Sequence, residues 1–208
     1  MKEIVTKASN LPTFSSSSYG EIKHLTEDEL NRLTEEFLKW YETKPNAKRA
    51  RYLLLFLFLR FTGARISEII SIDETRDIDF RRSEIRIKNL KKHKHKNSYR
   101  IVPVPDKLIA EYLRLCHIHP QIQNKALKVA RTNFFTTFRK ICKQAGIPED
   151  LAHPHILRHT RAIELIRAGV PITAVKSILG HSNLNTTAIY LQYSAVEIKE
   201  ILKIKGLV

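Results

Sequence analysis

Residues 51–60 read Arg-Tyr-Leu-Leu-Leu-Phe-Leu-Phe-Leu-Arg, and the seven residues from 53 to 59 are all apolar. A helix on the surface of a domain carries its apolar residues on one face, whereas this stretch is apolar on nearly every side. It therefore predicts a buried central helix over residues 47–61, with the rest of a domain packed around it. The stretch is far shorter than the roughly 20 apolar residues of a membrane-spanning helix, so no contact with a membrane is expected.

Helical patterns continue on both sides of this segment. Upstream, Thr26 and Glu29 match the capping box of a helix start. The flanking Leu25 and Leu30 match a hydrophobic staple, and apolar residues recur at helical spacing through Trp40. Downstream, the same spacing predicts helices over residues 107–116, 132–145, 154–168, 171–179, 186–193 and 196–204.

The spacing of the apolar residues changes from helical to alternating in the middle of the chain. Residues 77–80, 84–88 and 99–104 alternate or carry β-branched side chains, which predicts a small antiparallel sheet of two or three strands. The fold class is therefore mainly α with a small antiparallel β-sheet (α+β). One domain is expected over residues 25–208. Residues 1–24, which contain four consecutive serines, predict a flexible lead-in or linker.

The charge balance indicates a polyanionic partner. The chain has 36 Lys and Arg against 21 Asp and Glu, a net charge of +15 and an isoelectric point near 9.9. Charge alone leaves nucleic acid, the ribosome and an anionic membrane open, and the membrane is the weakest of these. Cys116 and Cys142 are too few for a disulfide scaffold and too far apart for a zinc site, so we expect two buried thiols. Residues 1–10 lack the apolar core of a signal peptide, so we expect none, and the expected location is cytoplasmic, associated with the nucleoid.

Four short motifs carry the candidate chemistry. Thr62-Gly63-Ala64-Arg65-Ile66-Ser67-Glu68 is followed by His155-Ile156-Leu157-Arg158-His159, then by Leu179-Gly180-His181-Ser182, and then by Tyr190, nine residues after His181. Each motif alone also has a purely structural interpretation. Arg65 can form a buried ion pair with Glu68, and Tyr190 can be a core aromatic, with Tyr193 as a rival one turn further on. Three neighbouring histidines, His153, His155 and His159, have no nearby carboxylate or thiolate that completes a metal site, so no metal is expected.

Together, the four motifs resemble the tyrosine recombinase (phage integrase) family, specifically its Xer-like and integrase-like catalytic domains. The resemblance extends from about Leu25 to the C-terminus and implies the catalytic-domain fold of that family. It implies that Tyr190 is the nucleophile, which attacks a DNA phosphodiester to give a 3′-phosphotyrosyl bond and a 5′-hydroxyl. Arg65 and Arg158 correspond to the arginines that bind the scissile phosphate. His155 and His181 correspond to the first and second active-site basic residues.

In this family a lysine of the β-hairpin protonates the departing 5′-oxygen. Residues 89–98 of this chain are unusually rich in lysine, so several candidates exist. Counting along the strand from Ile85 favours Lys91, whereas counting back from Arg100 favours a residue near Lys94 or Lys96. We predict Lys91 and leave Lys92, Lys94 and Lys96 as alternatives. Arg161 stands where the family is often apolar or aromatic, which indicates an added DNA contact.

The residue types suit this reaction. A phenol with a pKa near 10 is a poor nucleophile at neutral pH unless a base accepts its proton. Two guanidinium groups neutralise the charge that grows on the phosphorane oxygens, and a general acid adds roughly 10²–10⁴-fold in rate. Because the phosphotyrosine stores the energy of the broken bond, rejoining requires no ATP. We expect neither a cofactor nor a metal.

The expected partner is double-stranded DNA, with a tetramer assembled on paired sites and strand exchange through a Holliday junction. The C-terminal helix over residues 196–204 is a candidate for exchange between protomers. Since the resemblance begins at about Leu25, we expect the helical core-binding domain that usually precedes such a catalytic domain to be absent, either because this is a short natural recombinase or because the domain is separated from a longer one. The alternatives are DNA relaxation like that of a type IB topoisomerase and a non-catalytic DNA-binding protein. The DNA sequence that is recognised, and the choice among integration, resolution and inversion, stay open.

Overall fold

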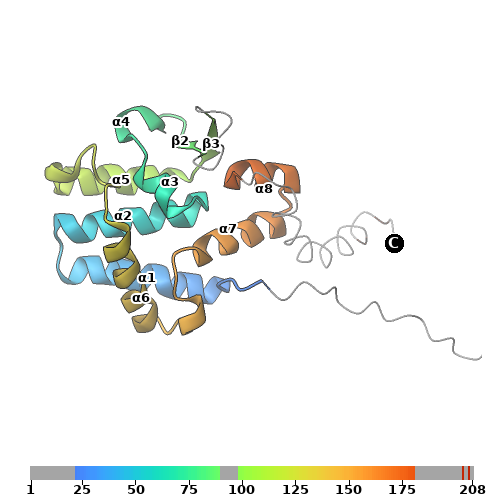
Figure 1. Ribbon diagram of the computed structural model, residues 1–208, viewed down its shortest axis with the longest axis horizontal. Coiled ribbons are helices and arrows are strands. Elements are labelled where there is room, and N and C mark those ends of the chain that lie inside the picture. Colours follow the sequence, from blue (N-terminus) through green and yellow to red (C-terminus); the bar gives the residue numbers. More distant parts are fainter. Residues whose placement is uncertain (1–21, 90–97, 181–202, 204–205, 207–208) are drawn as a thin grey trace, which may run out of the picture.

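The computed structural model describes residues 22–89 and 98–180, together with Lys203 and Gly206. Helices dominate, and a small sheet covers one side of them (Figure 1). The order of the elements is α1 Glu27–Thr43, α2 Ala47–Thr62, α3 Ile66–Ile70, α4 Glu74–Asp77, β1 Ile78–Asp79, β2 Glu84–Lys88, β3 Tyr99–Pro103, α5 Asp106–Ile118, the 3₁₀ turn Pro120–Ile122, α6 Arg131–Gln144, the 3₁₀ turn Glu149–Leu151, α7 Ile156–Arg167 and α8 Ile172–Leu179. The predicted class, mainly α with a small antiparallel sheet, is confirmed.

Helix α2 is the central helix, as its apolar stretch predicts. Every residue from Tyr52 to Leu59 is buried, and α2 lies between α1 and α5 (Figure 1). The ring of Phe56 stacks on that of Phe37 of α1, with centroids 4.0 Å apart. Burying a side chain of this size stabilises the fold by roughly 1.5–3 kcal/mol. The packed α1–α2 pair therefore supports the loops at its ends.

Local sequence determines where α1 begins and where α2 ends. The predicted capping box is present, because Glu29 N–H donates to Thr26 Oγ1 at 3.3 Å and Thr26 N–H donates to Glu29 Oε2 at 2.8 Å. Helix α2 ends at Gly63, whose φ of +62° is left-handed. A Cβ at Gly63 would lie 2.6 Å from Leu179 Cδ2, so glycine also allows α8 to approach this turn.

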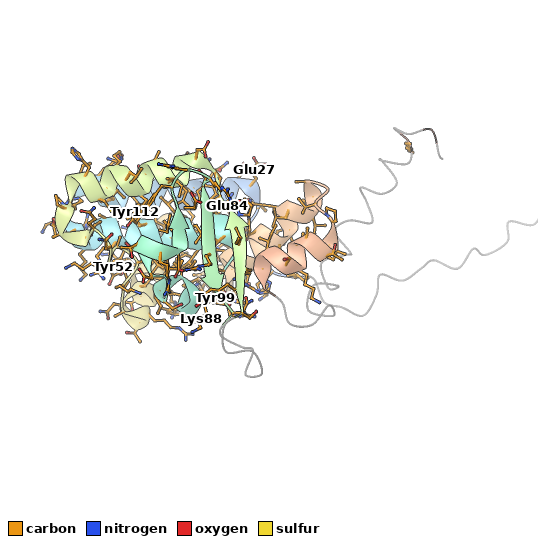
Figure 2. The ribbon with its side chains drawn as sticks, turned by 90° about the horizontal axis from the view of Figure 1, so that it is seen from above. Glu27, Tyr52, Glu84, Lys88, Tyr99 and Tyr112 are labelled. Atoms are coloured by element: carbon orange, nitrogen blue, oxygen red, sulfur yellow. The ribbon has the colours of Figure 1, made fainter. Side chains whose placement is uncertain are left out.

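The three strands form an antiparallel sheet in the order β1-β2-β3. Strand β1 is shorter than predicted, because Asp77 ends the short helix α4 that the alternation pattern did not reveal. Strands β2 and β3 run from the Glu84–Pro103 pair to the Lys88–Tyr99 pair. Figure 2 shows Glu84 and Lys88 at opposite ends of β2, with Tyr99 beside Lys88.

The last described helices, α7 and α8, pack against each other around a small apolar cluster. The helix predicted over residues 154–168 begins at Ile156, two residues later than expected. The helices predicted over residues 186–193 and 196–204 lie outside the described residues, apart from Lys203. Within the parts of the chain that the structure describes, every helix is too short or too polar to cross a bilayer.

Candidate active site

Arg65 is the N-cap residue of α3, directly after the turn that ends α2. Its backbone N–H donates to Glu68 Oε2 at 2.9 Å, and its Nη1 donates to Glu68 Oε1 at 3.1 Å. The Glu68 side chain is only 1% exposed, whereas that of Arg65 is 24% exposed. The predicted Arg65–Glu68 pair is therefore present, and it fixes a guanidinium that solvent, or a ligand, still reaches.

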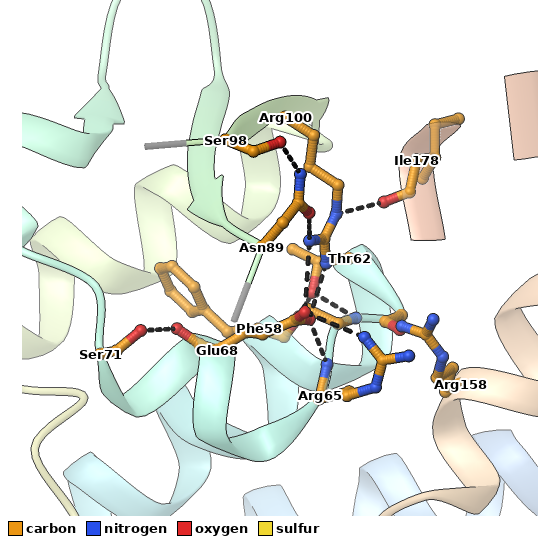
Figure 3. Close-up of polar contacts among 12 residues, drawn as sticks. Phe58, Thr62, Arg65, Glu68, Ser71, Asn89, Ser98, Arg100, Arg158 and Ile178 are labelled. Atoms are coloured by element: carbon orange, nitrogen blue, oxygen red, sulfur yellow. Dashed lines mark hydrogen bonds and ion pairs between the residues drawn. The ribbon is translucent and has the colours of Figure 1, made fainter. Parts of the chain in front are cut away.

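Arg158 reaches the same turn from α7. Its side chain is buried, and its Nη1 donates to the carbonyl oxygen of Gly63 at 2.8 Å. Gly63 precedes Arg65 by only two residues, so this hydrogen bond brings the two predicted phosphate-binding arginines together. Figure 3 shows the guanidinium groups of Arg65 and Arg158 near each other, on side chains from α3 and α7.

His155 is the N-cap residue of α7 and lies at the surface, although protein surrounds part of its ring. Its ring meets that of His159 edge to face, with centroids 4.8 Å apart. Desolvation by the surrounding protein, followed by the positive charges of His159 and Arg158, lowers the pKa of His155 to about 4. Desolvation and neighbouring cations likewise lower the pKa of His159 to about 4. Both rings are therefore neutral at pH 7, and a neutral imidazole can accept a proton.

We expect His155 to stay neutral through the range in which an ordinary histidine becomes protonated. In the protein without DNA, its NMR titration midpoint lies near pH 4 rather than near 6.5. Because His159 contributes to this lowering, His159→Asn raises the midpoint of His155. A DNA duplex also raises it, since a phosphate beside the ring favours the charged form. Side-chain ¹H–¹⁵N spectra, assigned with His155→Asn, measure these values. A midpoint at or above 6.5 without DNA contradicts the expectation.

A pocket of about 550 Å³ opens beside these residues. One wall comes from residues 64–67 and another from residues 153–155, so the pocket joins two of the sequence motifs. Arg131 and Phe135 of α6 complete it. Sequence reasoning missed these two, because no motif surrounds them and they enter the pocket only through tertiary packing. Four arginine and histidine side chains in one pocket favour an anionic ligand such as a phosphate.

Glu68 binds a second arginine, Arg100 of β3, which sequence reasoning also missed. Arg100 Nη2 donates to Glu68 Oε2 at 2.7 Å, and Nη1 donates to Glu68 Oε1 at 3.4 Å (Figure 3). Burial alone would raise the pKa of the Glu68 carboxyl. The hydrogen bonds and charges of Arg100 and Arg65 outweigh burial and lower the pKa. Glu68 is therefore an ionised carboxylate that holds both arginines.

Several predicted residues fall outside the described part of the chain. They are His181, Tyr190, Lys91 and the alternative lysines Lys92, Lys94 and Lys96. The described residues next to them are Asn89 and Ser98 beside the lysine segment, and Gly180 before His181. Arg161, predicted to contact DNA, donates to Glu164 Oε2 at 3.3 Å. In residues 22–89 and 98–180, no three His, Cys, Asp or Glu side chains gather as the ligands of a metal would.

The chain is similar to known proteins in both sequence and fold. The model of the phage integrase family matches residues 23–196, which is most of the chain. The chain belongs to the phage integrase family. A tyrosine recombinase of Thermosipho africanus is 36% identical over 177 residues, covering 83% of this chain and 58% of that protein. Tyrosine recombinase XerA of Thermococcus onnurineus is 30% identical over 191 residues, covering 86% of this chain and 61% of that protein. The chain thus spans little more than half the length of these curated relatives.

Solved structures share the fold. The XerH site-specific recombinase, in a post-cleavage complex with its palindromic difH substrate, is 25% identical with a TM-score of 0.67, and the alignment covers 88% of this chain and 53% of that one. The catalytic domain of bacteriophage HP1 integrase is 24% identical with a TM-score of 0.62. That alignment covers 90% of this chain and 97% of the HP1 domain. This chain therefore has the fold of an integrase catalytic domain.

Proposed function

We propose that residues 25–208 form the catalytic domain of a site-specific DNA recombinase, which cleaves and rejoins double-stranded DNA through a phosphotyrosine. The observation that carries this proposal is the convergence of Arg65 and Arg158 at the Gly63 turn beside the pocket that His155 lines. These three residues come from motifs about 90 residues apart in the chain. Membership of the phage integrase family and the net charge of +15 support the same substrate.

In the proposed reaction, the Tyr190 hydroxyl oxygen attacks the scissile phosphorus. The bond from this oxygen to phosphorus forms, and the bond from phosphorus to the 5′-oxygen breaks. Arg65 and Arg158 donate to the non-bridging oxygens and neutralise their growing charge, which their planar, forked geometry suits. His181 acts as the second basic residue at the same phosphate.

Two protons move during cleavage. The neutral ring of His155 is available to accept the phenolic proton as Tyr190 attacks. The departing 5′-oxygen gains a proton from a lysine of the segment after Asn89, which we assign to Lys91. Rejoining reverses these steps, with a 5′-hydroxyl attacking the phosphotyrosine. The energy of the original bond is kept in that linkage, so neither ATP nor a cofactor enters the proposed cycle.

The proposed working assembly is a tetramer on two paired DNA sites. Its proposed location is the cytoplasm, in association with the nucleoid. Strands are exchanged through a Holliday junction. The amphipathic segment over residues 196–204 is the proposed contact between protomers. A chain cut after Ser194 then loses assembly on DNA in gel filtration, and unchanged assembly contradicts this role.

The test uses a pool of DNA duplexes with randomised sequence, each with a nick close to its centre. Cleavage near a nick releases a short strand, so rejoining fails and the covalent product accumulates. We expect a protein–DNA adduct that survives denaturing electrophoresis, is linked through a 3′-phosphate and leaves a 5′-hydroxyl. Sequencing the trapped duplexes identifies the recognised site. The absence of an adduct, or a 5′-linked one, contradicts the proposed function.

A further inference from the structure

Arg100 is a buried arginine that contacts three separate parts of the site. Its side chain is 5% exposed and lies on the inward face of β3, which it shares with Val102. We propose that Arg100 is a positioning residue, which holds the hairpin that carries the general acid in register with Arg65. This inference rests on the proposed function.

The first contact is with the carboxylate of Glu68. Glu68 binds Arg100 through Nη1 and Nη2, and it binds Arg65 through the backbone N–H and Nη1. One buried carboxylate therefore accepts hydrogen bonds from both arginines. As a result, the position of β3 is tied to the position of the guanidinium that binds the phosphate.

The second contact is with the base of the β2–β3 hairpin. Arg100 Nη1 donates to Asn89 Oδ1 at 2.7 Å. Asn89 in turn donates its Nδ2 to Ser98 Oγ at 3.0 Å, and its backbone N–H to the Ser98 carbonyl at 2.8 Å. Asn89 and Ser98 are the last described residue before the lysine segment and the first after it. Lys91, the predicted acid, follows Asn89 by two residues.

The third contact is with the C-terminal end of α8. Arg100 Nε donates to the carbonyl oxygen of Ile178 at 2.8 Å. Gly180, two residues later, lies against the same guanidinium, because a Cβ there would be 2.7 Å from Arg100 Nη1. His181 follows directly. Arg100 thus joins the chain segments that lead to Arg65, to the lysines and to His181 (Figure 3).

A planar guanidinium suits this role because it donates in several fixed directions at once, which a lysine ammonium does not. A purely structural ion pair would affect every step of the reaction alike. A positioning role through Asn89 makes a narrower prediction, because only protonation of the leaving group depends on the hairpin. The structural and the positioning interpretations therefore predict different rates for a substrate whose leaving group needs no proton.

The experiment compares two nicked duplexes of the same trapped sequence. One has the natural 5′-oxygen at the scissile phosphate, and the other has sulfur in its place. With sulfur, the phosphorus–sulfur bond breaks and a thiolate leaves. A thiol has a pKa near 8.5, so its thiolate leaves without a general acid. Single-turnover adduct formation is measured for the unmodified protein, Asn89→Ala, Arg100→Met and the control Arg86→Met. Arg86 lies on the neighbouring strand β2 and pairs with Asp77, outside this network.

We expect Asn89→Ala to slow cleavage of the oxygen substrate by about 10–10²-fold and to change cleavage of the sulfur substrate by less than about threefold, since a general acid contributes roughly 10²–10⁴-fold. Arg100→Met shows the same selective loss, plus a smaller loss on both substrates because Glu68 also holds Arg65. Arg86→Met leaves the ratio of the two rates unchanged. Thermal unfolding checks that each variant is folded.

The inference is overturned if Asn89→Ala slows both substrates equally, or slows neither, while the unmodified protein cleaves both. If the unmodified protein cleaves neither substrate, the proposed function fails, and the inference fails with it. Should Arg100→Met not fold, Asn89→Ala alone decides, because it removes only a half-buried side chain at the hairpin base.

Discussion

Replacing Tyr190 with phenylalanine abolishes the covalent protein–DNA adduct, leaving no detectable product on the nicked duplexes. The phenyl ring keeps the shape of the side chain but has no oxygen that can bond to phosphorus. Non-covalent binding to the same duplexes, measured by electrophoretic mobility shift, stays within about twofold, because Tyr190 contributes no charge to the phosphate contacts. Adduct formation is followed by denaturing electrophoresis over time.

Tyr193 provides the matched control. It lies three residues further along the chain and is the other tyrosine of the same predicted helix. Tyr193→Phe forms the adduct at close to the unmodified rate. If the adduct instead survives Tyr190→Phe and disappears with Tyr193→Phe, then the nucleophile is Tyr193 and the assignment made here is wrong.

Arg158→Lys lowers the single-turnover cleavage rate by about 10²–10³-fold, equivalent to about 2.7–4 kcal/mol of transition-state stabilisation. Lysine keeps the positive charge but cannot donate two parallel hydrogen bonds to a phosphate. It also replaces a buried guanidinium that donates to the Gly63 carbonyl, so the turn before Arg65 loses a support. Rates are measured on the trapped duplex at saturating protein, which separates the loss of rate from a loss of binding.

Arg161→Lys is the control for this change. Arg161 lies one turn further along α7, is partly buried, and donates to Glu164, while only its aliphatic stem, which lysine retains, lies against Gly63. We expect its cleavage rate to stay within a few-fold of the unmodified protein. Equal losses in both variants would indicate that α7 was disturbed as a whole, and an unchanged rate in Arg158→Lys would remove Arg158 from the phosphate site.

Much of the fold follows from local sequence. The start of α1 is predictable because Thr26 and Glu29 satisfy each other's backbone within four residues, and α2 ends where Gly63 permits a left-handed turn. Helix α4 was missed because its end depends on a distant group. The Asp77 carboxylate accepts from the Asp73 N–H but also binds Arg86 of β2, and no local pattern reveals that partner.

The residues of the site likewise divide into those that local sequence predicts and those that depend on distant partners. The Arg65–Glu68 pair was predictable because residues three apart on a helix are neighbours. Arg100 was not, since its partner Glu68 lies 32 residues away. A signal was nevertheless present in the alternation of β3, where Arg100 shares the inward face with Val102 while Ile101 is 61% exposed. A charged residue in an inward register is rare unless it is paired, and this one marks the site.

The contacts of Arg100 also govern when activity can arise during synthesis of the protein. Its partners stand 11, 32 and 78 residues away in sequence, and the most distant, Ile178, follows nearly all the described chain. Long-range contacts form late because they require the intervening chain to close. A nascent chain still on the ribosome, lacking α8, cannot complete this junction. The proposed phosphate site is therefore aligned only after α8 has been synthesised.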